Sequence, residues 1–151
     1  MTTAALTLGG DARAQVPVQP MQPQPLPGNT CDIAVSPMRF PNYDPSVPYD
    51  TSAVDTFSIF CNAPHVLVIS LITNDRCMQR YLRRALDRLA YNLYQDAGNS
   101  IVWGSLNPIC GRVETDSILR RTDFSVYGLL PREQNVRAGT YTDVVTIEAD
   151  F

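Results

Sequence analysis

The residues of this 151-residue chain that could do chemistry are few and form no catalytic pattern. His65 is the single histidine, so any site that pairs a serine or cysteine nucleophile with a histidine base would have to use it. The sequence contains no G-x-S-x-G nucleophile motif and no glycine-rich phosphate-binding loop. Asp55 and Asp143 are as well explained by turns or strand edges as by catalysis. The sequence therefore predicts neither an enzyme nor a bound cofactor.

The cysteines predict disulfides rather than a metal site. The four are Cys31, Cys61, Cys77 and Cys110, with no C-x-x-C pair among them, and one histidine does not complete a zinc site. An even number of cysteines in a short chain with features of export is typical of a disulfide framework, for which three pairings are open. The net charge of −3 and the pI near 5.0 do not suggest nucleic acid or an anionic membrane as a partner.

The first thirty residues read as segments outside the folded domain. Ala12-Arg13-Ala14 fits the small-x-small pattern of a signal-peptidase site, which makes residues 1–14 the remnant of a secretion signal and Gln15 the first mature residue. The alternative is that Met1 is genuine and begins a disordered arm. Residues 15–30 are rich in proline and glutamine, a composition that prefers polyproline II and reads as an arm or linker.

From residue 31 onward the sequence has the pattern of a β protein. Short stretches of β-branched and aromatic residues are bounded by turn residues, and no alternation of strands with helices appears. About seven strands are expected, at 31–35, 53–61, 65–72, 89–94, 100–104, 118–130 and 141–151. This number and spacing predict an all-β sandwich.

The segment Arg76–Leu89 is ambiguous. Its apolar residues fit a helical stripe, but Arg80, Arg84 and Arg88 repeat at the i, i+4 spacing on the opposite side, where like charges disfavour a helix. We expect a helical turn or an irregular crossover. The arginines could bind an acidic surface or a polysaccharide, although a solvated, salt-bridged face explains them more simply.

The final stretch, from Tyr141 to Phe151, alternates with a period of two. One face is apolar apart from a single carboxylate; its members are Tyr141, Asp143, Val145, Ile147, Ala149 and Phe151. No further strand follows to pair with this one. A long apolar strand with a bare edge is an aggregation hazard unless another chain covers it. We therefore expect these six residues to form an edge that receives a strand from a partner.

Several motifs together resemble a known family. Cys31 is followed by F-x-x-Y-D-P at 40–45, L-A-Y-N-L-Y-Q-D occurs at 89–96 and V-W-G at 102–104. V-Y-G at 126–128 precedes Q-N-V-R-A-G-T-Y-T-D at 134–143. In order and spacing these resemble the spore coat protein U domain, which is also the pilin fold of archaic chaperone–usher pili. The resemblance covers residues 31–151.

The resemblance implies an immunoglobulin-like sandwich of about seven strands that lacks its last strand. A periplasmic chaperone lends the missing strand during export, and in the fibre the N-terminal arm of a neighbouring pilus subunit replaces it. The implied partners are this chaperone, an outer-membrane usher and neighbouring subunits, and the implied location is a pilus on the cell surface. A disulfide between Cys31 and Cys61 is also implied, which leaves Cys77 and Cys110 to pair.

The arm departs from the family pattern, because the prolines of residues 15–30 remove backbone donors that a donated strand needs. A subunit that accepts a strand but cannot donate one belongs at a fibre end, so we expect a tip or minor subunit that serves adhesion and biofilm formation. Two alternatives stay open. One is a self-contained secreted binding module that uses Arg80 and Arg84 or the arm, and the other is a structural protein of a spore or cyst coat.

Overall fold

The regular structure of the chain is entirely β in the part that the computed structural model describes, residues 2–9, 30–104, 113–115 and 118–150. Within those residues, no helix has the length and hydropathy that a membrane span requires. The strands of this part are β1 (Thr2–Gly9), β2 (Cys31–Ala34), β3 (Thr51–His65), β4 (Val68–Ile72), β5 (Arg80–Arg84), β6 (Asp87–Tyr94), β7 (Val113–Glu114), β8 (Ile118–Leu130) and β9 (Thr142–Asp150).

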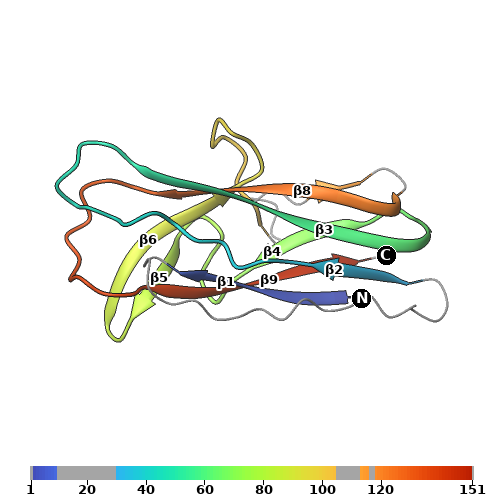
Figure 1. The fold of residues 1–151 in the computed structure, drawn as a ribbon, viewed down its shortest axis with the longest axis horizontal. Coiled ribbons are helices and arrows are strands. Elements are labelled where there is room, and N and C mark those ends of the chain that lie inside the picture. Colours follow the sequence, from blue (N-terminus) through green and yellow to red (C-terminus); the bar gives the residue numbers. More distant parts are fainter. Residues whose placement is uncertain (1, 10–29, 105–112, 116–117, 151) are drawn as a thin grey trace.

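The strands form two layers that are joined by β6, and every pairing is antiparallel (Figure 1). One layer has β2, β3 and β8, with the end of β6 beside β8 from Asn92 to Tyr94. The other has β4, β5, β7, β9 and β1, with the first part of β6 beside β5. The predicted all-β sandwich is confirmed. Residues 65–72 are not one strand, however, because β3 continues through an irregularity to His65 and the chain turns before β4.

The core lies between the layers and follows the period-two pattern of the strands. Phe57 stacks on Phe124 with 5.3 Å between ring centroids and is tilted against Trp103 at 6.1 Å. Trp103 is buried, whereas Tyr94 is half-buried. Burying a large apolar side chain is worth about 1.5–3 kcal/mol. The other fully enclosed apolar side chains include Met38, Ile59, Leu67, Ile69, Leu71, Leu82, Leu93, Leu130 and Ile147.

The ambiguous segment is a β-hairpin, so the expected helical turn or irregular crossover is wrong. β5 and β6 pair from Arg80 opposite Tyr91 to Arg84 opposite Asp87, and two residues connect them. Such two-residue turns need a positive φ, which Ala85 adopts at 50°. Leu82 and Leu89 are seven residues apart and so fit a helical stripe, but in the hairpin they are buried opposite each other on the two paired strands.

Residues of the motifs noted in the sequence attach the loop that leads into β9 to the rest of the sandwich. The Gln134 side chain pairs with the backbone of Ala90, donating from Nε2 to its carbonyl at 2.8 Å and accepting its N–H at 2.7 Å. The Tyr43 hydroxyl donates to the Pro131 carbonyl at 3.0 Å and accepts the Gln134 N–H at 2.8 Å. At Gly128, a Cβ atom would lie 2.6 Å from the Phe40 ring, which explains the glycine of the V-Y-G motif. These contacts attach the loop to the sandwich just before β9 begins.

Candidate functional site

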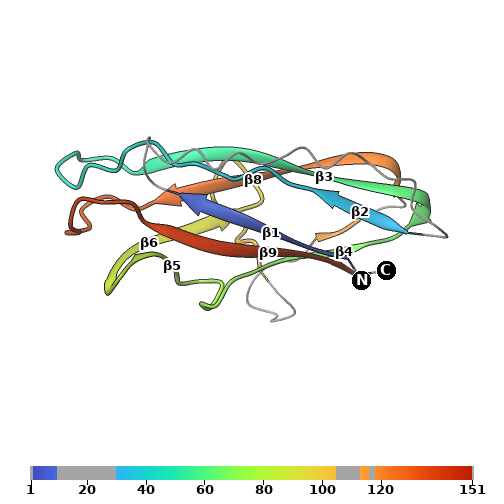
Figure 2. The same cartoon turned by 60° about the horizontal axis from the view of Figure 1, so that its bottom comes forward.

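The last strand, β9, has neighbours on both edges. On one edge it pairs with β4, from Val68 opposite Asp150 to Ile72 opposite Thr146, and with β5 at Thr142. On the other edge it pairs with β1 along the whole length of β1 (Figure 2). The expectation of a bare edge is therefore wrong for the whole chain, because residues 2–9 occupy that edge.

The register of β1 explains why residues 2–9 fit there. Antiparallel partners point to the same face of a sheet. The even-numbered residues of β1, Thr2, Ala4, Leu6 and Leu8, stand opposite Ala149, Ile147, Val145 and Asp143, which are all buried. Ala4 packs against the core. The T-T-A-A-L-T-L-G segment thus matches the alternation of β9, with apolar residues at three of the four positions that stand opposite buried residues of β9.

The domain of residues 31–151 is one strand short when it is taken by itself. Only β1, from outside that range, pairs with the second edge of β9 in the described chain. We call the space that β1 occupies beside β9 the strand-accepting groove. Of the six residues expected at this edge, Asp143, Val145, Ile147 and Ala149 pair with β1; Tyr141 is buried just before the pairing begins, and Phe151 lies outside the described residues.

β1 is not predicted from the sequence, because a short apolar stretch before a small-x-small site resembles a signal peptide. The alternation of residues 2–9 was the available signal. Cleavage after Ala14 stays a prediction, and the predicted proline-rich arm falls mainly in the range 10–29, outside the described residues. Cleavage at that site would remove β1 from the mature chain, so the N-terminus of the mature protein decides whether the strand-accepting groove is filled by its own chain.

The single carboxylate of the groove is held by a buried polar network. Asp143 is 8% exposed, and its Oδ2 accepts a hydrogen bond from the Tyr91 hydroxyl at 2.7 Å. Its Oδ1 lies 3.9 Å from a guanidinium nitrogen of Arg83, which also forms an ion pair with Asp75. Burial, together with the neighbouring Asp143 charge, raises the pKa of Tyr91 above its ordinary range, so the hydroxyl remains a donor. The network ties β9 to the β5–β6 hairpin.

Arg80 lies in the core rather than on a solvated face, with 1% of its surface exposed. Its guanidinium donates to the backbone carbonyls of Leu71 at 2.9 Å and Trp103 at 2.8 Å and to the Asn92 side chain at 3.0 Å. Burial lowers the pKa of Arg80, and nearby Tyr91 and carboxylates oppose that shift. The expected solvated arginine face is wrong at this position, and a surface ligand cannot reach Arg80.

The Spore Coat Protein U domain family is matched by residues 17–148. The chain belongs to this family. It is 31% identical over 133 residues to Protein U of Myxococcus xanthus, covering 76% of this chain and 71% of that relative.

Solved structures also resemble the family member described here. The CsuC–CsuE chaperone–tip adhesion subunit pre-assembly complex, from archaic chaperone–usher Csu pili of Acinetobacter baumannii, aligns with a TM-score of 0.58 and 21% identity. The alignment covers 82% of this chain but 40% of the solved chain, so this protein spans less than half of that structure, and the likeness shows the fold. The AfaE-3 adhesin of Escherichia coli aligns over 99% of this chain and 94% of its own length with 16% identity and a TM-score of 0.46, too low to support an argument.

The family match begins after β1, so the family assignment does not account for β1. It does include the first disulfide that the resemblance implied: Cys31 and Cys61 are opposite each other on β2 and β3 and are bonded at 2.04 Å. Cys77 is not a free thiol. Cys110 lies outside the described residues, and its pairing with Cys77 stays a prediction.

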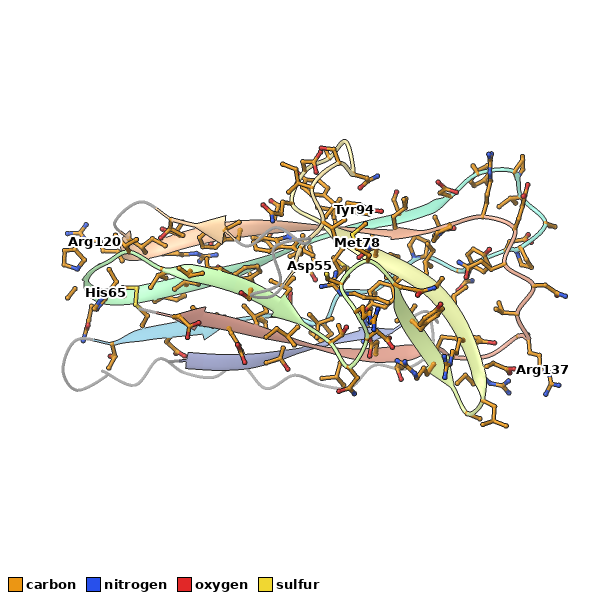
Figure 3. The ribbon with its side chains drawn as sticks, turned by 180° about the vertical axis from the view of Figure 1, so that it is seen from behind. Asp55, His65, Met78, Tyr94, Arg120 and Arg137 are labelled. Carbon is orange, nitrogen blue, oxygen red and sulfur yellow. A yellow bond between two sulfur atoms is a disulfide. The ribbon has the colours of Figure 1, made fainter. Side chains whose placement is uncertain are left out.

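The residues first considered for catalysis do not converge in this family member. His65 lies at one end of the sandwich and Asp55 near its middle (Figure 3), where Asp55 accepts a hydrogen bond from the Ser36 hydroxyl at 3.3 Å. Asp143 faces Tyr91 and Arg83 as described above. Among the described residues, no group of three or more histidine, cysteine or acidic side chains is placed to hold a metal ion.

The Asp75–Arg83 pair predicts a loss of stability in acid. Burial opposes ionisation of Asp75, but hydrogen bonds from Arg83 and the Tyr81 N–H outweigh it and hold the pKa of Asp75 below its ordinary value. In the unfolded chain this pKa is about 3.9. A group with a lowered folded pKa contributes stability above the unfolded value and loses it as the pH falls through the folded value. Unfolding free energies measured from pH 6 to pH 2 should therefore decrease below about pH 4.

Asp75→Asn should flatten part of that decrease, since the neutral amide does not titrate. Asp32→Asn, at an exposed position of β2 away from this ion pair, is the comparison variant. An Asp75→Asn chain with the full acid dependence of the parent would show that this ion pair is not its source. Hydrogen bonds also lower the pKa values of Asp44, Asp96 and Asp123.

Proposed function

We propose that this chain is an exported structural subunit of an archaic chaperone–usher pilus that assembles by donating a β-strand to a neighbouring copy. The pairing of β1 with β9 carries the proposal. It supplies both parts that strand donation requires, a domain with an unfilled edge and a segment of matching alternation outside that domain. Family membership and the fold of the Csu tip subunit support the same function.

The covalent connection of β1 favours exchange between copies. β1 and β2 run in the same direction (Figure 2), so the chain must return along the sandwich to join them. That return needs roughly 30 Å, the length of a nine-residue strand such as β9. In a polyproline II conformation, a segment as long as residues 10–30 could reach roughly 65 Å. A connection of this reach leaves the same strand free to pair with a second copy, as in domain swapping.

This assignment changes the position that we propose within a fibre. Residues 15–30 make a poor donor, and on their own they favour a tip or minor subunit. If the mature chain keeps residues 2–9, which requires that it is not cleaved after Ala14, one chain can both accept and donate, and we propose a repeating subunit. Before assembly, a periplasmic chaperone would occupy the strand-accepting groove, and an outer-membrane usher would accept the subunit for export and surface attachment. A coat component of a spore or cyst, which the family and Protein U of Myxococcus xanthus favour, is the second candidate.

Cross-linking between two differently labelled copies tests the exchange. Ala5 and Thr146 are opposite each other in the register of β1 and β9, on the outward face of the sheet. We expect that a chain with Ala5→Cys, mixed with a chain with Thr146→Cys under mild oxidation, forms a disulfide between copies. A single chain with both changes is the positive control for the register, and Ser52→Cys in place of Thr146→Cys is the off-site control. Failure to form a mixed disulfide, while the doubly substituted chain closes internally, would refute assembly by exchange.

A further inference from the structure

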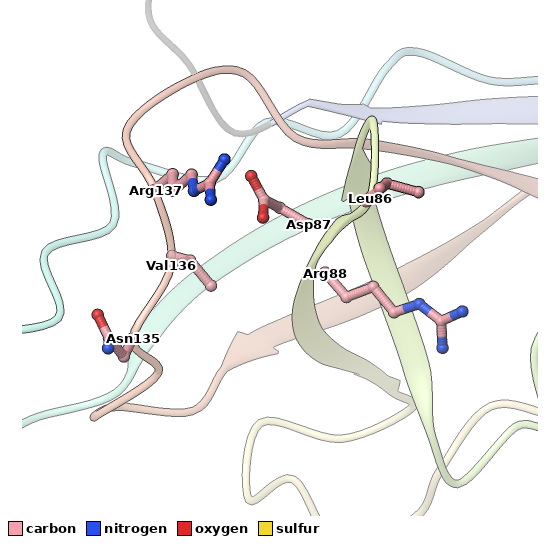
Figure 4. Close-up of a pocket in the computed structure, with 6 residues that line it drawn as sticks. All are labelled: Leu86, Asp87, Arg88, Asn135, Val136 and Arg137. Carbon is pink, nitrogen blue, oxygen red and sulfur yellow. The ribbon is translucent and has the colours of Figure 1, made fainter.

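A surface recess lies at the end of the strand-accepting groove. It is formed by the tip of the β5–β6 hairpin and by the loop that precedes β9, and its lining is Leu86, Asp87, Arg88, Asn135, Val136 and Arg137 (Figure 4). Thr142 fixes its position, because this residue pairs with Gly9 on one edge and with Arg83 on the other. Figure 4 also shows the end of β1, in pale blue, at the loop that carries Arg137. The recess therefore borders the point at which an inserted strand leaves the groove.

The charges around the recess leave one cation without a partner in the described part of the chain. Asp87 forms an ion pair with Arg84 at 3.6 Å. The Arg88 guanidinium lies over the Tyr81 ring, 5.6 Å from its centroid. Arg137 is exposed, and its guanidinium has no ion-pair partner among the described residues. The recess thus favours an anion beside Arg137.

The hairpin tip adds an apolar surface next to that cation. Leu86 is 96% exposed, although it stands at a turn where asparagine and glycine are the usual residues. Its neighbour Ala85 adopts the positive φ that the turn needs. A leucine in this position does not contribute to burial within the chain, and it offers a contact to whatever occupies the recess.

We infer that the recess holds residues Gly10–Arg13 of the copy that donates the strand, with the Asp11 carboxylate paired to the Arg137 guanidinium of the accepting copy. Asp11 is the first charged residue after β1, and two residues of extended chain place it about 7 Å beyond Gly9. In a donating copy these residues belong to a different chain, so they do not have to connect β1 to β2 of the sandwich that accepts the strand. The inference rests on the proposed strand exchange and names the contact that follows the inserted strand.

The pair would also specify the register of the donated strand. Apolar residues at the even positions of β1 could fit β9 after a slip of two residues, because Val145, Ile147 and Ala149 are all apolar. A slip of that size moves Asp11 by about 7 Å along the groove and separates it from Arg137. An ion pair between Asp11 and Arg137 at the end of the groove therefore favours the register in which Gly9 stands opposite Thr142.

A charge swap in the two-copy cross-linking assay tests the inference. The donor chain carries Ala5→Cys with or without Asp11→Arg, and the acceptor chain carries Thr146→Cys with or without Arg137→Asp. We expect either charge change alone to slow formation of the mixed disulfide about two- to fivefold, the range of an exposed ion pair, and both together to restore the rate. Arg120→Asp is the matched control, since Arg120 is exposed at the opposite end of the sandwich (Figure 3).

The outcomes separate this inference from the proposed function. A mixed disulfide whose rate does not depend on either charge would overturn the Asp11–Arg137 contact and leave strand exchange intact. Restoration of the rate by the double swap, with no response to Arg120→Asp, would support the contact. Absence of a mixed disulfide with the parent charges would overturn both, because no donated strand would then reach the recess.

Discussion

A chain without residues 2–9 is expected to be less stable than the full chain by about 3–5 kcal/mol, since Val145 and Ile147 lose the strand that covers them. The truncated chain also exposes a row of unpaired backbone groups along β9, and such an edge recruits other chains. Urea unfolding followed by fluorescence of Trp103 measures the first effect. Light scattering measures the second, which should appear as concentration-dependent association.

Substitutions within β1 provide the matched comparison. Leu6→Asp places a charge opposite buried Val145 and should cost nearly as much as the deletion. Thr7→Asp, opposite exposed Val144, should change stability by no more than about 0.5 kcal/mol. A synthetic peptide of residues 2–9 should restore part of the lost stability to the truncated chain. Equal stability of the full and truncated chains would mean that β1 is not the strand that completes the sandwich.

The two strands that meet at the strand-accepting groove, β9 and β1, differ in how far the sequence predicted them. The alternation from Tyr141 to Ala149 predicted the strand and its buried face, because a period of two can be recognised in consecutive residues. The partner itself was not predicted. Pairing between residues 2–9 and 142–149 is set by register across almost the whole chain, and eight residues with modest apolar character resemble part of a signal peptide equally well.

In the β5–β6 hairpin, the sequence pattern did not predict which arginine is buried. The spacing of its arginines fitted an exposed face, and the structure instead buries Arg80 while Arg84 and Arg88 stay at the surface. An arginine can be buried only where its guanidinium reaches enough hydrogen-bond acceptors, and this separates Arg80 from Arg84 and Arg88. The carbonyls of Leu71 and Trp103 come from distant segments, so local pattern contains no sign of the pocket that receives the Arg80 guanidinium. Buried charges depend on such nonlocal partners.

Replacement of Arg80 by methionine is expected to destabilise the chain by about 3–5 kcal/mol, the usual result of breaking a buried charged network from one side. Methionine fills similar space but leaves the carbonyls of Leu71 and Trp103 and the side chain of Asn92 without their donor. Arg80→Lys should fall between methionine and the parent, because a lysine keeps the charge but cannot reproduce the guanidinium fork. Denaturant unfolding of the three chains at neutral pH gives these differences directly.

Arg88→Met separates this structural role from the alternative of a ligand-binding arginine face. Arg88 belongs to the same hairpin but is exposed and contacts only the face of Tyr81 among the described partners, so its loss should cost no more than about 1 kcal/mol. If Arg80 served a surface ligand, both substitutions would leave stability nearly unchanged and would differ in binding alone. A large loss of stability on substitution of Arg80, with a small loss on substitution of Arg88, would instead mean that Arg80 holds β4, β6 and the Trp103 segment together. These elements lie behind the strand-accepting groove, so Arg80 would then support the surface on which β9 receives its partner strand.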